Sequence, residues 1–141
     1  MKKLIALLLF FQITGFTQST DQGALKRLLA KGGFSGELNG KVRLTQLGTI
    51  QCGQTGYAVI YYEWEESNPP GAAIHATQRV LFLGGDRHYV GSYSVDDRPL
   101  KIAPASILFD YLQALGNVIK CSRTQLPKTV LLNGEPRVLF K

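Results

Sequence analysis

The octapeptide YAVIYYEW, residues Tyr57–Trp64, decides the fold more than any other stretch of this sequence. Aromatic and β-branched side chains occupy both of its alternating faces, whereas a strand with one solvent face alternates apolar with polar residues. The stretch is therefore typical of a central strand that is covered on each side. Turn residues at 53–56 precede it, and the run SNPPG, Ser67–Gly71, ends it.

A short helix is predicted well before this strand. Asp21–Lys31 carries a leucine stripe at helical spacing, and Thr20 or Asp21 can serve as its N-cap. The pair Gly32-Gly33 follows at once and stops the helix.

Most of the remaining chain alternates apolar and polar residues between Gly-rich and Pro-rich turns. Strands are expected at Lys41–Cys52, where Gly48 permits a bulge, at Ser106–Tyr111 and at Asn117–Cys121. The pattern predicts a mainly β fold, an antiparallel β-sandwich or barrel of about eight strands behind the short N-terminal helix.

A hairpin is predicted between His75–Leu83 and Arg87–Val95, with the turn GGDR at 84–87. Glycine takes positive φ at low cost, and Asp bonds to local backbone groups, so Gly-Gly-Asp suits a turn. This register sets Phe82 opposite Tyr89 and His75 opposite Asp96. The cluster of polar residues around the turn is thus explained by the fold, without a special site.

A second hairpin is predicted at the C-terminal end of the sequence, in KTVLLNGEPRVLFK. A three-residue loop, Asn133–Glu135, pairs Val130 with Val138. A two-residue Asn-Gly turn is the commoner choice for this composition, but it would set Val130 against Arg137.

The first 19 residues, MKKLIALLLFFQITGFTQS, have the three-part layout of a secretory signal peptide. A basic start is followed by an apolar run at 4–13, and Thr17 and Ser19 supply small residues for cleavage after Ser19. We therefore expect a mature single domain, 20–141, in the periplasm or secreted from the cell, with no membrane-spanning segment.

Two cysteines, Cys52 and Cys121, remain in the expected mature chain. Each shares its strand phase with an isoleucine two residues earlier, so both are expected to point toward the core. Export places them where thiols oxidise, and the sequence predicts a structural disulfide. A catalytic or metal-binding thiol pair would need a CxxC spacing or a nearby histidine.

The scattered distribution of the basic residues and the expected export argue against nucleic acid as a partner. The formal charge of +6 falls to +4 once Lys2 and Lys3 leave with the leader. The remaining basic residues are scattered, with no basic run of the kind that binds nucleic acid.

The candidate binding residues are Trp64, Glu63 and Glu65. An indole beside carboxylates is a platform for a sugar ring or a cationic partner. The simpler interpretation is that Trp64 closes one end of the core while the glutamates stay solvated. Both interpretations remain open at this point.

Catalytic and metal sites are weakly indicated. The sequence has no G-x-S-x-G nucleophile motif. His75 and His88 would lie roughly 20 Å apart along the predicted hairpin, too far to share a metal ion. We expect no cofactor and no metal.

The sequence thus favours an exported, non-enzymatic protein that binds another envelope or extracellular macromolecule, as an inhibitor, immunity or accessory factor does. The alternative is a small hydrolase acting on envelope glycan, with Glu63, Glu65 or the His75–Asp96 pair as acid and base.

Overall fold

The computed structural model describes residues 21–66, 75–99, 101–109 and 117–141. The helix and strands in this part of the chain are, in order, α1 (Gln22–Lys31), β1 (Val42–Cys52), β2 (Thr55–Glu66), β3 (His75–Gly84), β4 (Tyr89–Ser94), β5 (Lys101–Ala103), β6 (Ser106–Leu108), β7 (Val118–Lys120), β8 (Thr129–Leu132) and β9 (Glu135–Val138). The predicted mainly β class, with antiparallel sheets and one short helix, is confirmed. The predicted leader, 1–19, lies outside the described residues.

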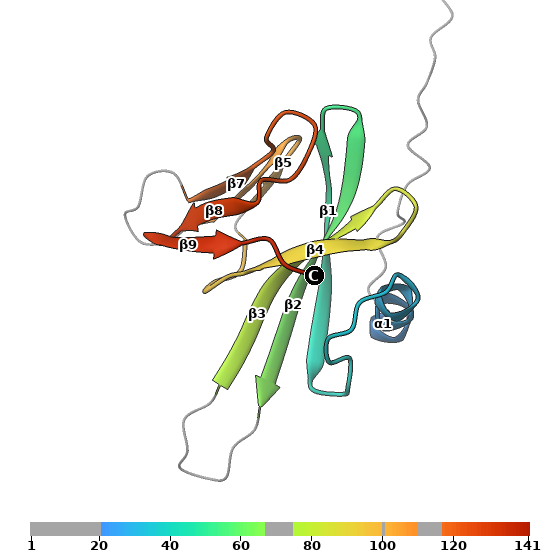
Figure 1. The fold of residues 1–141 in the computed structure, drawn as a ribbon. Coiled ribbons are helices and arrows are strands. Elements are labelled where there is room, and N and C mark those ends of the chain that lie inside the picture. Colours follow the sequence, from blue (N-terminus) through green and yellow to red (C-terminus); the bar gives the residue numbers. More distant parts are fainter. Residues whose placement is uncertain (1–20, 67–74, 100, 110–116) are drawn as a thin grey trace, which may run out of the picture.

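The strands form one large and two small antiparallel sheets (Figure 1). The large sheet has the order β1-β2-β3-β4, and the small sheets are β5-β6-β7 and β8-β9. The strands of the small sheets lie on one side of the large sheet, and α1 lies on the other. The helix begins where the sequence predicts, because the Asp21 side chain accepts hydrogen bonds from the Gly23 and Ala24 amides.

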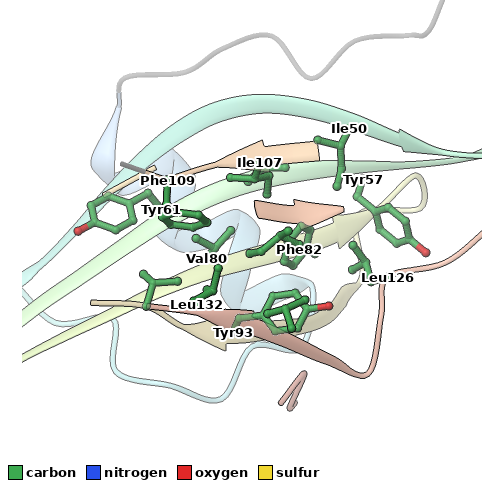
Figure 2. Close-up of a cluster of buried hydrophobic side chains, with 14 of the residues drawn as sticks. Ile50, Tyr57, Tyr61, Val80, Phe82, Tyr93, Ile107, Phe109, Leu126 and Leu132 are labelled. Carbon is green, nitrogen blue, oxygen red and sulfur yellow. The ribbon is translucent and has the colours of Figure 1, made fainter. Parts of the chain in front are cut away.

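Strand β2 is buried on both faces, as the sequence predicts for Tyr57–Trp64. Its odd-numbered side chains from Tyr57 to Tyr61 belong to a first core, and its even-numbered ones from Ala58 to Tyr62 belong to a second. The first core lies between the large sheet and the small sheets, which contribute Ile107 and Leu132 (Figure 2). Ile119 of β7 belongs to the same core. The second core lies beneath α1.

Strand β1 serves both cores because of a bulge beside Gly48. The pairing with β2 shifts by one residue between Gln46 and Gly48, and Gly48 has a φ of 136°, which glycine adopts readily. Val42 and Leu44 therefore lie in the second core, whereas Ile50 and Cys52 lie in the first. The predicted bulge is confirmed, but these even-numbered residues do not share one face.

The β3–β4 hairpin forms, but its predicted register is wrong by two residues, since Phe82 pairs with Gly91. The loop has three residues: the Arg87 amide donates to the Gly84 carbonyl, and the Gly84 amide donates to the His88 carbonyl, both at 2.9 Å. Arg87 takes the left-handed conformation, with φ 65°. An irregularity after Phe82 adds a second residue of shift. The total shift of two residues keeps Val80, Phe82 and Tyr93 on their predicted face. Next to the turn the shift is one residue, so Tyr89, predicted to share a face with Phe82, lies in the second core instead.

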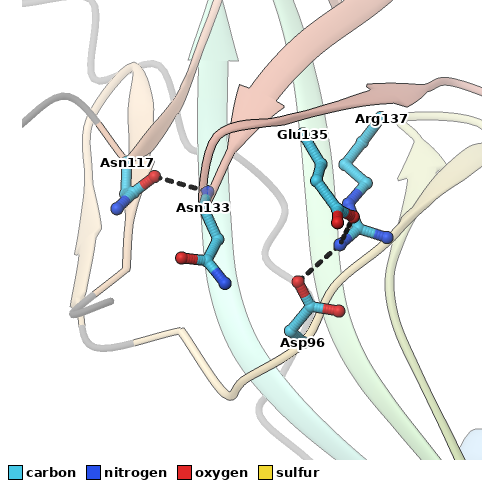
Figure 3. Close-up of polar contacts among 5 residues, drawn as sticks. All are labelled: Asp96, Asn117, Asn133, Glu135 and Arg137. Atoms are coloured by element: carbon cyan, nitrogen blue, oxygen red, sulfur yellow. Dashed lines mark hydrogen bonds and ion pairs between the residues drawn. The ribbon is translucent and has the colours of Figure 1, made fainter. Parts of the chain in front are cut away.

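The C-terminal hairpin uses the two-residue Asn-Gly turn instead of the predicted three-residue loop. Asn133 and Gly134 have φ values of 51° and 76°, as a type I′ turn requires. Val130 consequently pairs with Arg137. This arrangement is tolerated because the half-buried guanidinium of Arg137 forms ion pairs with Asp96 and, at 3.0 Å, with Glu135 (Figure 3).

The edges of the large sheet are covered at several points. At β1, the Gln22 side-chain amide donates to the Leu44 carbonyl at 2.7 Å and accepts from the Leu44 amide at 2.8 Å. At β4, Ser92 exchanges backbone hydrogen bonds of 2.8 and 3.0 Å with Phe140. Such contacts oppose edge-to-edge association of sheets.

The predicted disulfide between Cys52 and Cys121 is present and joins the end of β1 to the residue after β7. It therefore links the large sheet to a small sheet across the first core. A disulfide is compatible with a location in the periplasm or outside the cell.

Candidate functional site

Four charged side chains from the end of β2, the start of β1 and the turn just before β1 gather at one end of the large sheet. Lys41, Arg43, Glu63 and Glu65 line a small hollow of about 110 Å³. We call these four residues the charged end. They lie where β1 begins and β2 finishes, at the end of the sheet that points away from the small sheets (Figure 1).

The strand register explains why these residues meet. Arg43 pairs with Glu63 across the β1–β2 ladder, and directly opposed residues share a face of the sheet. Arg43 and Glu65 are exposed, while Glu63 is half-buried. Within the described residues, neither Arg43 nor Glu65 has an ion-pair partner within 4.0 Å. Charges of both signs are thus presented to solvent in one place.

Glu63 also acts on the adjacent tyrosine of its own face. The Tyr61 hydroxyl donates a hydrogen bond to Gln78 Oε1 at 2.7 Å. Burial raises the pKa of Tyr61, and the nearby Glu63 carboxylate raises that pKa further. The Arg98 guanidinium lies 5.6 Å from the centre of the Tyr61 ring and works in the opposite direction. Tyr61 therefore stays neutral at neutral pH.

Trp64 lies on the other face of β2, because successive strand residues alternate. Its half-buried side chain packs against the second core. The indole Nε1 is buried and has no hydrogen-bond partner among the described residues. The structure therefore does not bring the indole together with Glu63 and Glu65, and the three residues form no common platform.

The predicted His75–Asp96 pair does not form in the strand ladder. The backbone of His75 pairs with Glu66, and the β3–β4 ladder ends at Arg79 and Ser94. The Asp96 carboxylate instead binds the Arg137 guanidinium (Figure 3). The shifted hairpin register is the reason, since it moves β4 two residues along β3.

The turn of the β3–β4 hairpin holds a second candidate, an oriented histidine. Asp86 Oδ2 lies 3.1 Å from His88 Nδ1, and Asp86 Oδ1 accepts from the His88 amide at 3.0 Å. The hydrogen bond from that amide lowers the pKa of Asp86. His88, Ser35, Tyr89 and Lys141 contribute to a hollow of about 440 Å³. Both members of the pair are strongly exposed, as expected for a solvated turn.

The described residues contain no cluster of three or more His, Cys, Asp or Glu side chains that could hold a metal ion. Both cysteines are in the disulfide. No helix in the described ranges has the length and apolar character needed to cross a membrane.

Lys41 and Arg43 were missed by reasoning from the sequence, although a signal for them exists. Cys52 pairs with Thr55 at the turn, and the bulge beside Gly48 removes one residue from the count. Counting back along both strands then sets Arg43 opposite Glu63. Only the combination of turn and bulge gives this result, because either feature alone leaves the register undecided.

Comparisons with protein-family models, with curated proteins and with solved structures gave no match for this chain.

Proposed function

We propose that this chain is an exported, non-enzymatic binding protein and that it holds a protein partner through the charged end. The partner would be another macromolecule of the envelope or the extracellular space, as for an inhibitor, immunity or accessory factor. The observation that carries the proposal is the meeting of Lys41, Arg43, Glu63 and Glu65 in one hollow.

The chemistry of the charged end favours a protein over a glycan as the partner. Two cations and two carboxylates on one surface suit a partner that presents both signs of charge, and such complementarity gives specificity. Recognition of a sugar ring relies on an exposed aromatic face, whereas Trp64 packs against the second core on the opposite face. The predicted leader and the disulfide support export.

The test is affinity capture from an envelope extract, with the exported protein as bait and charge-reversal variants beside it. We expect Arg43→Glu and Glu65→Lys each to weaken capture of the partner at least tenfold, because a reversed charge faces its former complement. Lys128→Glu is the matched control, since Lys128 is exposed and lies outside the charged end. Equal recovery with all variants would refute this surface as the binding site.

A hydrolase acting on envelope glycan remains the second candidate, now because of a different observation. The Asp86 carboxylate orients the His88 imidazole, and Ser35 lines the same hollow. Nucleophilic catalysis needs an oriented imidazole within hydrogen-bond reach of a hydroxyl, and this hollow contains both groups in its lining. Release of soluble fragments from cell-wall material by the wild type, and its loss in His88→Ala, would favour this candidate over the binding protein.

A further inference from the structure

A separate hollow of about 390 Å³ lies between α1 and the edge strand β1. Its charged lining consists of Lys26 from α1, Lys41 from the turn before β1, and Arg43 from β1, without a carboxylate. Gln22, Gly40 and Val42 complete it. We call this feature the cationic hollow.

The cationic hollow is held in place by hydrogen bonds centred on Asn39. The Asn39 carbonyl accepts from Lys26 Nζ at 2.9 Å and from the Val42 amide at 3.1 Å. The Asn39 side-chain oxygen accepts from the Lys41 amide at 2.9 Å. The Lys26 ammonium is thus fixed by one of its three protons, which leaves two for a ligand.

Nearby carboxylates neutralise the positive charge of the cationic hollow only in part. Glu63 and Glu65 line the neighbouring smaller hollow together with Lys41 and Arg43. Glu37 accepts from the Asn39 side-chain amide at 3.3 Å. Lys26 lies outside that smaller hollow, so the side of the cationic hollow nearest α1 has a cation without an acidic neighbour in its lining.

We propose that the cationic hollow binds a phosphoryl group. The Arg43 guanidinium presents a planar fork that matches phosphate oxygens, and the two ammonium groups add compact positive charge. Three cations in the lining of one hollow suit a doubly charged anion better than a single carboxylate. The hollow is larger than phosphate itself, so the group can be part of a larger molecule. This site goes beyond the proposed protein partner and does not depend on it.

The test uses inorganic pyrophosphate as the probe, with amide chemical shifts of the exported protein as the readout at low salt. We expect saturable shifts at Gly40, Val42 and Arg43, and about tenfold weaker binding for Lys26→Gln, since one charged contact is lost. Lys128→Gln is the matched control and should bind as the wild type does. Absent shifts at these amides, or equal weakening in both variants, would overturn the proposal.

Vesicles distinguish the source of the phosphoryl group. The protein is sedimented with vesicles of phosphatidylglycerol and phosphatidylcholine, and with vesicles of phosphatidylcholine alone. Co-sedimentation only with the anionic vesicles, reduced by Lys26→Gln, supports a lipid headgroup. Pyrophosphate binding without co-sedimentation supports a soluble phosphate compound. Charge reversal at Glu65 tests the protein partner, so failure of one idea is distinguishable from failure of the other.

Discussion

The Gln22 side chain is expected to hold α1 on the edge of the large sheet. Its amide makes two hydrogen bonds to the Leu44 backbone, at 2.7 and 2.8 Å, both part-buried. A typical hydrogen bond contributes about 0.5–1.5 kcal/mol net, so Gln22→Ala should lower the free energy of unfolding by about 1–3 kcal/mol. The same change leaves the Leu44 donor and acceptor free on the edge, where a second chain can pair with them.

Gln22→Glu gives a sharper test because its effect depends on pH. At neutral pH the carboxylate still accepts from the Leu44 amide, but it has no proton for the Leu44 carbonyl. Placing an anion at the first helical residue contributes about 0.3–1 kcal/mol of stabilisation. The unsatisfied carbonyl and the facing negative charge cost about 1–3 kcal/mol, which exceeds the gain from the helix dipole, so the substitution should destabilise the fold overall.

Protonation of this glutamate restores a donor, so folding favours the neutral form and raises its pKa in the native state. The Gln22→Glu variant therefore regains the lost stability as pH falls below the unfolded-state pKa of about 4.3. At any pH above the raised native-state pKa, the variant lacks that stability. Urea unfolding followed by fluorescence of the single tryptophan measures this. Gln54→Glu, at an exposed turn position, is the control at each pH. The reasoning fails if Gln22→Glu matches Gln54→Glu at neutral pH, or if its deficit persists in acid.

Two further predictions concern the stability of the fold. Replacing Cys52 and Cys121 together by alanine should lower the free energy of unfolding by about 4 kcal/mol, because the disulfide closes a loop across 69 residues of sequence. Urea unfolding measures this loss. Alkylation of the untreated wild type by a thiol reagent would contradict the presence of the disulfide. Burial raises the pKa of Tyr61, Tyr62, Tyr89 and Tyr93, so these side chains ionise in the unfolded state before they ionise in the native state. The free energy of unfolding should therefore fall as pH rises above about 10, by about 1.4 kcal/mol per pH unit for each such tyrosine. Urea unfolding midpoints measured between about pH 8 and 11 test this.

Strand positions could be predicted from the sequence because alternation and turn residues are local signals. The central strand, the capped helix and the bulge beside Gly48 all follow from a few neighbouring residues. Hairpin registers could not be predicted as well, because they depend on the φ values of single loop residues. Arg87 adopts a left-handed conformation that the composition of the GGDR turn does not demand.

The C-terminal hairpin has the two-residue turn that its Asn-Gly composition favours, although a three-residue loop was predicted. The Asn-Gly composition favoured a two-residue turn, but that turn would set apolar Val130 opposite charged Arg137. The ion pairs of Arg137 with Asp96 and Glu135 satisfy that charge. Asp96 belongs to a distant part of the sequence, so no local pattern could reveal this compensation.

The candidate site was harder to predict than the core because it depends on which residues lie opposite one another. Burial needs only the correct face, and the register error of two residues preserved that along most of the β3–β4 hairpin, with Tyr89 as an exception. Predicting the charged end also requires knowing which residue lies opposite each glutamate in the strand ladder. Glu63 and Glu65 were identified from their own strand, whereas Arg43 comes from the neighbouring strand and Lys41 from the turn just before it.

The bulge beside Gly48 connects the fold to the candidate site. Ile50 and Cys52 lie in the first core, so an unbroken β1 would also turn Val42 and Leu44 toward that core and send Arg43 beneath α1. The extra residue reverses this phase. Val42 and Leu44 then pack under the helix, and Arg43 faces outward beside Glu63. One inserted position in the edge strand therefore both completes the second core and assembles the charged end.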